Sequence, residues 1–104
     1  PAAPTRVPTR VSVTVAKNAA RRGQRLRVWG KVENFDGLGV ANLRVEIYLS
    51  RDGRAAQALL GAAITDKGGG YDVELPIPRN IVVGRYKVFA ATPGDQRHEA
   101  SLSE

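Results

Sequence analysis

The stretch TDKGGGYDV, residues 65–73, has the composition that comes closest to a ligand-binding loop. A run of glycines can direct several backbone N–H groups at a phosphate, normally with a helix N-terminus behind them and a Lys followed by Ser or Thr. Here Lys67 precedes the glycines, and the residues after them alternate like a strand and end in prolines. The pattern therefore favours a turn between two strands, in which glycine permits positive φ.

Aspartates in the turns suggest a second chemistry, calcium binding. Asp66 and Asp72 flank the glycines, and Asp36, Asp52 and Asp95 lie in other turns. Calcium needs several oxygen ligands at loop spacing, and the loops of a sandwich gather at its two ends. No D-x-D or D-x-N-x-D run is present, however, and Asp before Gly commonly forms a turn. We expect no metal site, with calcium binding in the loops as the alternative.

Residues that could catalyse a reaction are sparse. His98 is the single histidine and the chain has no cysteine, which excludes disulfides, thiolate metal sites and a cysteine nucleophile. Ser101, His98 and Glu99 could be written as a triad, but neighbours in a strand point to alternate faces and cannot form the relay. The sequence therefore predicts a protein that is not an enzyme and uses no cofactor.

Aromatic side chains beside cations form the remaining candidate site, on the outward positions of predicted strands. Such a surface can stack on sugars or bases and bind anions. The alternative, which we favour, is structural cover: arginine stems lie over the indole, and Asp72 or Glu74 pairs with cations of the neighbouring strand. The candidate binding face comprises Trp29 with Arg25, Arg27 and Lys31, Phe89 with Arg85 and Lys87, and Tyr48 beside Arg44.

Composition sets the outer limits on function. The chain has 104 residues, enough for one domain, and a net charge of +6 that attracts anionic partners without choosing among them. Nucleic acid is disfavoured, because the basic residues are spread along many strands and no recognition helix or RNP-type motif is present. No apolar run reaches membrane-spanning length and no signal peptide is present. Since the chain begins without Met, we expect it to be a piece of a larger protein.

A period of two residues dominates the chain and predicts strands. Residues 1–10, with Pro4 and Pro8, read as a linker or lead-in, and residues 11–104 as the domain. The predicted strands are 11–15, 24–34, 43–50, the second half of 55–65, 71–75, 86–90 and 97–103, the last with Ala100 and Leu102 inward. The Ala and Leu content of 55–65 also allows a helix. The expected core is Val28, Val32, Val45, Ile47, Val73, Leu75, Tyr86 and Val88. About seven antiparallel strands without a strong helix predict an all-β, immunoglobulin-like β-sandwich.

Three stretches carry a family resemblance: GKVENFDGLGVANLRVEIYL, LGAAITDKGGGYDVELPIP and GRYKVFAATPGD. Their order and spacing resemble bacterial surface Ig-like repeats and the carboxypeptidase-regulatory-like domains with a prealbumin-type sandwich. The matching positions are Gly30, Val32, Gly39, Val45, Ile47, Thr65, Asp66, Gly69, Tyr71, Gly84, Tyr86, Val88, Ala90 and Gly94.

That resemblance implies a structural function and does not imply a ligand. It points to a non-catalytic module that spaces, stiffens or presents other domains of an exported protein, located in the periplasm, at the cell surface or outside the cell. The residue sets of the hydrolase and dioxygenase branches of the prealbumin-type fold are not present. Expected partners are the other domains of the parent chain. The alternatives are an anionic or carbohydrate polymer on the candidate binding face, or a protein paired along a free edge strand.

Overall fold

The computed structural model describes residues 7–16, 19–51, 57–80, 84 and 86–103, which form strands and turns and no helix. The prediction of an all-β sandwich is confirmed, with eight strands where about seven were expected, because the predicted strand 11–15 is divided in two. The strands are β1 (Thr9–Val11), β2 (Thr14–Val15), β3 (Arg25–Asn34), β4 (Arg44–Arg51), β5 (Gln57–Ile64), β6 (Gly70–Pro76), β7 (Tyr86–Thr92) and β8 (Ser101–Leu102).

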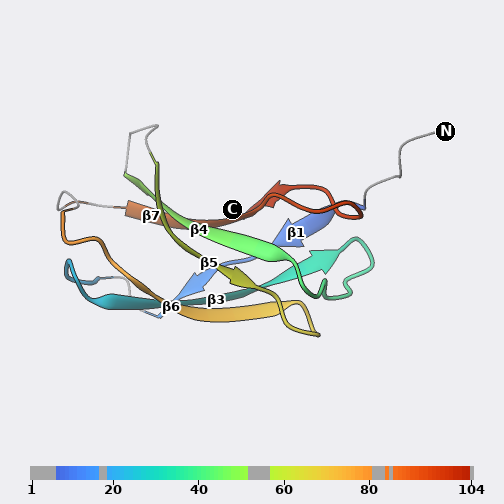
Figure 1. Ribbon diagram of the computed structural model, residues 1–104, viewed down its shortest axis with the longest axis horizontal. Helices are drawn as coiled ribbons and strands as arrows, with labels where there is room; N and C mark the ends of the chain where they lie inside the picture. The colour runs from blue at the N-terminus through green and yellow to red at the C-terminus, as the bar shows by residue number, and fades with distance from the viewer. Residues whose placement is uncertain (1–6, 17–18, 52–56, 81–83, 85, 104) are drawn as a thin grey trace.

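Two antiparallel sheets make up the fold, and we name each by its central strand. In the β3 sheet, β3 pairs with β6 on one side and with β1 and then β2 along the other. The β4 sheet has the order β5-β4-β7-β8. In Figure 1, β4, β5 and β7 lie above β3 and β6, so the sheets form two layers. The chain crosses from one layer to the other after β3, after β5 and after β6.

The core lies between the layers and is built by alternation along each strand, since successive side chains point to opposite faces of a sheet. From β3 it receives Leu26, Val28 and Val32, and from β4 Val45 and Ile47. Each such burial contributes about 1.5–3 kcal/mol to folding. The remaining buried core residues are Val11, Val40, Leu43, Tyr71, Leu75 and Ala90. The predictions for Val28, Val32, Val45, Ile47 and Leu75 are confirmed.

Three other predicted core residues are less buried than expected. Val73 and Val88 are partly buried and pack against the core from its border. Tyr86, at the start of β7, is also only partly buried. On β6, the longer side chains of Tyr71 and Leu75 are buried, while the shorter Val73 between them stays at the border of the core.

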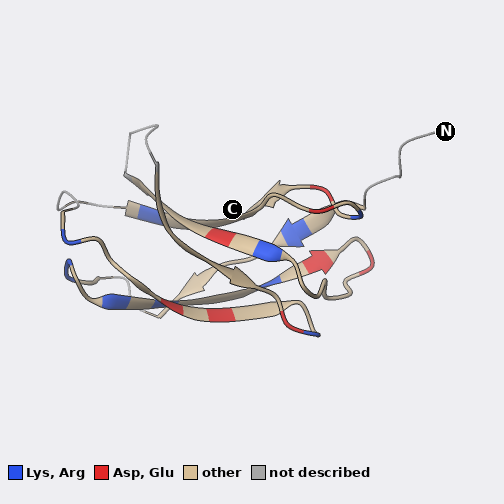
Figure 2. Ribbon diagram, in the orientation of Figure 1, with Lys and Arg blue, Asp and Glu red and all other residues tan. Residues whose placement is uncertain are grey.

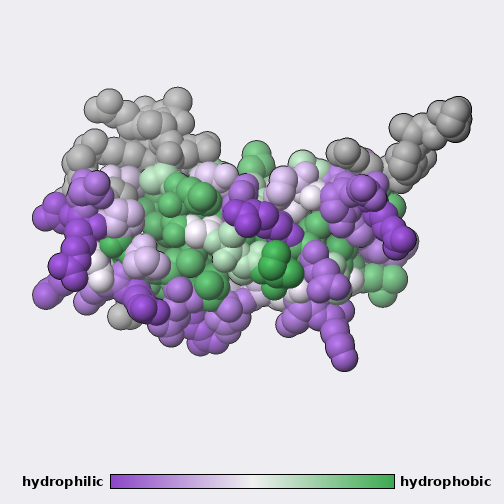
Figure 3. Space-filling model, viewed as in Figure 1, coloured by the Kyte–Doolittle hydropathy of each residue, from purple (hydrophilic) through white to green (hydrophobic). Residues whose placement is uncertain are grey.

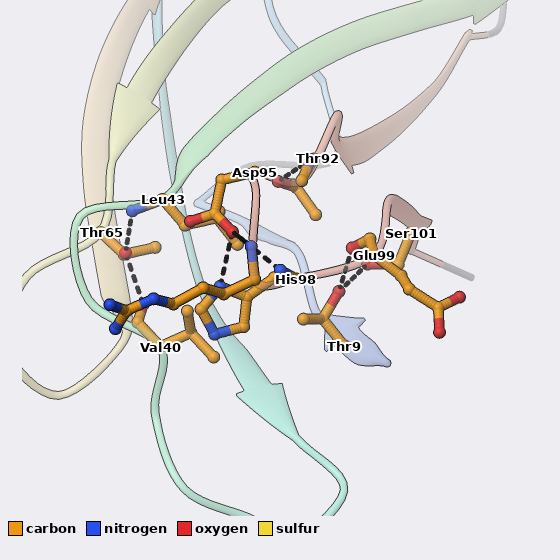
Figure 4. A network of polar contacts seen from close by, with 11 residues as sticks. Thr9, Val40, Leu43, Thr65, Thr92, Asp95, His98, Glu99 and Ser101 are labelled. Carbon is orange, nitrogen blue, oxygen red and sulfur yellow. Dashed lines mark hydrogen bonds and ion pairs between the residues drawn. The ribbon is translucent and has the colours of Figure 1, made fainter. Parts of the chain in front are cut away.

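The predicted strand 97–103 is wrong over its first half. The Asp95 carboxylate accepts N–H groups from Arg97 and His98, each at 2.8 Å, and holds this part of the chain in a turn (Figure 4). Only Ser101–Leu102 pairs with β7. Leu102 lies opposite Ala91 and Ser101 opposite Thr92, whose side chain is buried. Leu102 therefore faces outward, and Ala100 is exposed as well, so the inward prediction for both is incorrect.

The segment TDKGGGYDV is a turn between β5 and β6, as predicted. Gly69 has φ +81°, and the Asp66 carboxylate accepts the N–H groups of Gly68 and Gly70 at 2.9 and 3.0 Å. The buried Thr65 hydroxyl donates to the Val40 carbonyl and accepts the Leu43 N–H at 2.9 Å (Figure 4). The turn is thus bonded to the loop between β3 and β4.

The sheet begins before the expected domain start at residue 11. Thr9 and Arg10, predicted as part of the lead-in, pair with Asn34 and Glu33 of β3. Val7 pairs in parallel with the C-terminal segment, where its N–H donates to the Arg97 carbonyl at 2.8 Å. Val7, Thr9, Val11 and Val13 keep a two-residue period that extends past Pro8, so the alternation already begins before residue 11. The earlier part of the expected lead-in, residues 1–6, lies outside the described residues.

Candidate functional site

The candidate binding face divides between the two outer surfaces of the sandwich. Arg25, Arg27, Trp29 and Lys31 alternate with buried residues of β3 and therefore lie on the outer face of the β3 sheet. Tyr48, Phe89 and Lys87 lie on the outer face of the β4 sheet, because their neighbours Ile47, Leu49 and Ala90 are buried. Arg85 lies outside the described residues. The structure does not bring the two aromatic groups together.

On the outer face of the β3 sheet, Trp29 is covered by a side chain of its own strand. The Arg27 guanidinium carbon lies 5.2 Å from the centroid of the Trp29 ring. The same guanidinium donates from Nε and Nη2 to the two oxygens of Asp72 on β6, at 3.0 and 2.5 Å. Asp72 is directly opposite Trp29 in the register. The cation is therefore held over the indole from the neighbouring strand, as the structural-cover hypothesis expects.

The hydrogen bonds between Arg27 and Asp72 stabilise the charged forms of both side chains. Those from Arg27 lower the pKa of Asp72 below its usual value, and those to Asp72 raise the pKa of Arg27. Both side chains are about half exposed, so water screens the attraction and the pair is worth little in stability. Its consequence is geometric, because a two-bonded guanidinium has a fixed orientation.

The rest of this face alternates in sign. Arg10 pairs opposite Glu33, and Arg27 opposite Glu74. Figure 2 shows the cations of β3 beside the carboxylates of β6. Arg25 and Lys31 are exposed at either side of the Arg27–Trp29 pair and form no ion pair with a described residue.

On the outer face of the β4 sheet, Tyr48 and Phe89 are opposite each other on β4 and β7. Their rings stack, with centroids 5.3 Å apart and planes 15° apart. The Tyr48 hydroxyl donates to Oε1 of Glu46 at 3.0 Å, and Arg44 Nε donates to Oε2 at 3.2 Å. The bond to Glu46 raises the pKa of Tyr48. Arg44, Glu46 and Tyr48, three successive outward residues of β4, thus satisfy one another's hydrogen-bonding groups. The sequence analysis did not predict this network, although an i, i+2, i+4 spacing on one strand places the three side chains on the same face.

The catalytic and metal hypotheses find no assembled site in the described part of the chain. His98 Nδ1 contacts Asp95 Oδ1 at 2.8 Å, but the Ser101 hydroxyl bonds to Thr9 at 2.9 Å (Figure 4). The hydrogen bond from the Arg97 N–H is the main cause that lowers the pKa of Asp95. The bond with the His98 side chain is the second cause. No group of three or more His, Asp or Glu among the described residues is placed to hold a metal ion. The turn carboxylates Asp66 and Asp95 bind backbone amides instead.

A surface hollow of about 680 Å³ runs along β1 between the end of β3 and β8. Of the candidate residues, Lys31 alone borders it, together with Thr9–Val13, Phe35 and Leu102. Neither Trp29 nor the Tyr48–Phe89 pair borders this hollow.

Comparison of the chain with protein-family models, curated proteins and solved structures finds no match. Within the described residues, no helix has the length and apolar character needed to cross a membrane.

Proposed function

We propose that this chain is a non-catalytic, immunoglobulin-like structural domain that spaces or presents other parts of a larger exported or cell-surface bacterial protein. The observation that carries the proposal is that Trp29 is already in contact with another side chain of the protein. Its ring is covered by Arg27, which Asp72 holds by two hydrogen bonds. A sugar or base that stacked on this side of the indole would have to displace a guanidinium that Asp72 holds by two hydrogen bonds.

Connectivity supports the immunoglobulin-like part of the proposal. The first strands and β6 lie in one sheet, while β4, β5, β7 and β8 lie in the other. In these sheets β3 and β6, distant in sequence, are neighbours in one layer, and β4 and β7 are neighbours in the other, as in the Greek-key connections of immunoglobulin-like sandwiches. The bacterial and exported parts of the proposal rest on the sequence resemblance alone.

A second candidate function is binding of an anionic polymer. Arg25 and Lys31 favour it, because both are exposed beside the Arg27–Trp29 pair and the net charge of the chain is +6. In that case the polymer would contact the two cations as point charges and leave the indole covered.

Fluorescence of Trp29, the single tryptophan, separates the two functions. The protein is titrated with heparin, a neutral polysaccharide and duplex DNA at physiological salt, and calorimetry is run in parallel to report the other face. The scaffold proposal expects no saturable change in emission or heat with any of them. A saturable response that Arg25→Ala and Lys31→Ala abolish, but Arg97→Ala in the turn after β7 does not, would replace the scaffold with the polymer-binding function.

A further inference from the structure

The outermost strand of the β4 sheet covers only one end of its neighbour. β8 pairs with Ala91 and Thr92 at the end of β7 (Figure 1). One residue further on, Ser103 exchanges two hydrogen bonds with Ala90: its N–H donates to the Ala90 carbonyl and its hydroxyl accepts the Ala90 N–H, each at 2.8 Å. Backbone groups of an antiparallel strand point alternately to its two neighbours, so Val88 directs its N–H and C=O to the same side as Ala90. In the described part of the chain neither group of Val88 has a hydrogen-bond partner.

The two long sides of the sandwich are closed to different extents. On one side β5 contacts β6, and Leu75 fills the space over Gly61, where an added Cβ would lie 2.5 Å from Leu75 Cδ2. Figure 3 shows apolar residues gathered over β4 and β5, between hydrophilic ends of the molecule. On the other side β1 contacts β8, but β8 has only two residues. Beyond its end, the edge of β7 is left without a neighbouring strand among the described residues.

Apolar side chains along this second side are less buried where β8 has ended. Val11 on β1 and Ala90 on β7, which lie level with β8, are 4% and 0% exposed. Further along the same two segments, Val13, Val15 and Val88 pack against the core but are only partly buried. Alternation places all three on the inward side. An apolar strip therefore borders the unpaired edge of β7, and it includes the predicted core residue Val88.

The path of the chain at Ser103 leads along this strip. The C-terminal segment runs parallel to the first described residues, as the pairing of Val7 with His98 shows. Beyond Ser103 the same direction leads between Val88 on one sheet and residues 13–15 on the other. The surface hollow of about 680 Å³ is bordered by Ser103, so the start of this path is not filled by the described residues.

We propose that the segment that follows Ser103 in the larger protein completes the β4 sheet as a continuation of β8, antiparallel to β7. The inference rests on the proposed function in one respect, because it requires that the chain is part of a larger protein. A strand there gives the N–H and C=O of Val88 their partners and covers the apolar strip, as a sheet edge with unpaired backbone groups and apolar neighbours requires.

The register of β8 fixes the chemistry of this segment. Since Ser103 lies opposite Ala90, the second residue after Ser103 lies opposite Val88, and it and the fourth residue face inward. Both are therefore apolar. The third residue faces outward beside the exposed cation of Lys87 and is polar or acidic. The connection to the next domain then begins as a strand of this domain, which fixes the direction in which that domain leaves, as a spacer needs.

Hydrogen exchange at the Val88 amide, followed by NMR, tests the vacant edge in the 104-residue protein and in two extended versions of it. One version carries Val-Glu-Val-Glu after Glu104, which places both valines at inward positions. The matched control carries Glu-Val-Glu-Val, which has the same composition but turns carboxylates inward, where burial is costly. The valine-first extension slows exchange at Val88 at least about tenfold and raises the urea midpoint, while the control changes neither. The Phe89 amide, which points to β4 in all three proteins, is the internal reference.

Four outcomes would overturn the proposal. They are a Val88 amide that is as protected as that of Phe89 without any extension, no slowing by the valine-first extension, equal slowing by both extensions, and a larger protein with a charged residue or proline at the second or fourth position after Ser103. None of them touches the scaffold function, which the polymer titrations test at the outer faces. A saturable polymer response would in turn leave the expected exchange at Val88 unchanged, so the two proposals can fail separately.

Discussion

At the scale of single residues, Tyr71 is the side chain whose ionisation burial changes most. It is 5% exposed in the core, and its hydroxyl donates to the Ser12 carbonyl at 2.6 Å. Gly30 leaves the space for this bond, because a Cβ there would lie 2.1 Å from the Ser12 oxygen and 2.7 Å from the Tyr71 hydroxyl. Burial raises the pKa of Tyr71 from 10.0 to about 12.

This pKa predicts an alkaline loss of stability. Below pH 10 the phenol is protonated in both the folded and the unfolded protein, and its contribution is fully present. Between pH 10 and 12 the unfolded chain releases the proton while the folded protein keeps it, so the free energy of unfolding falls by about 3 kcal/mol. Urea unfolding at pH 9, 10, 11 and 12 measures the loss.

Tyr71→Phe is the comparison for this prediction. The variant is less stable at pH 9, because the Ser12 carbonyl loses its donor. Its stability also declines less between pH 10 and 12, because the variant lacks the Tyr71 phenol whose proton release destabilises the wild type. A decline as steep as that of the wild type would show that Tyr71 ionises normally.

At the scale of elements, the glycine turn and the loop after β3 touch through their backbones. A Cβ on Gly39 would lie 1.9 Å from the Gly68 carbonyl oxygen, a contact that backbone cannot relieve by rotating a side chain. Gly68 has open space in its own Cβ direction, with Asp66 Oδ1 nearest at 3.6 Å and no positive φ. The two residues are in contact, but an added methyl group fits at Gly68 and collides with backbone at Gly39.

Gly39→Ala is therefore expected to lower the free energy of unfolding by about 1–3 kcal/mol, the cost of overpacking. Gly68→Ala is expected to change it by less than about 0.5 kcal/mol. Urea unfolding of both variants beside the wild type checks the pair. Equal effects would mean that the loop and the turn move apart freely and are not packed as described.

The elements were predictable where alternation was unambiguous. Every inward position of β4 is Leu, Val or Ile, so its strand and its buried face could be read directly. The alanine-rich β5 left helix and strand open, and its bulge opposite Ile47, where Leu60 has no partner in the register, carries no sequence signal. The strand predicted over 97–103 was wrong in its first half, because the Asp95 carboxylate binds the N–H groups of Arg97 and His98 and forms a turn where the sequence alternates.

Contacts between distant segments set the other limit. The run of glycines indicated a turn, but not that Gly39 packs against Gly68, since the two are joined only through the fold. Outward positions were predicted correctly for Trp29, Tyr48 and Phe89. Their separation onto opposite faces was not, because periodicity places a side chain inside or outside and does not assign its strand to a sheet.

At the scale of the whole molecule, the first described residues join both sheets. Val7 accepts the Glu99 N–H and donates to the Arg97 carbonyl, each at 2.8 Å. The Thr9 hydroxyl donates to the Glu99 carbonyl (Figure 4), while β1 itself pairs with β3 and buries Val11. One short segment thus bonds to the β3 sheet and to the segment that leads into β8.

A protein that begins at Ser12 is therefore expected to be less stable than one that begins at Val7. Loss of Val11 costs about 1.5–3 kcal/mol in burial, and each of the backbone hydrogen bonds to the C-terminal segment and β3 adds about 1 kcal/mol. The predicted difference is at least about 4 kcal/mol, measured from urea midpoints and slopes. Comparing these two proteins isolates residues 7–11, because neither contains residues 1–6. Equal stabilities would place the start of the folded domain after residue 11 and show that β1 adds no stability. A large difference would show that the contacts of residues 7–11 with β3 and with Arg97 and Glu99 help to hold the two layers together.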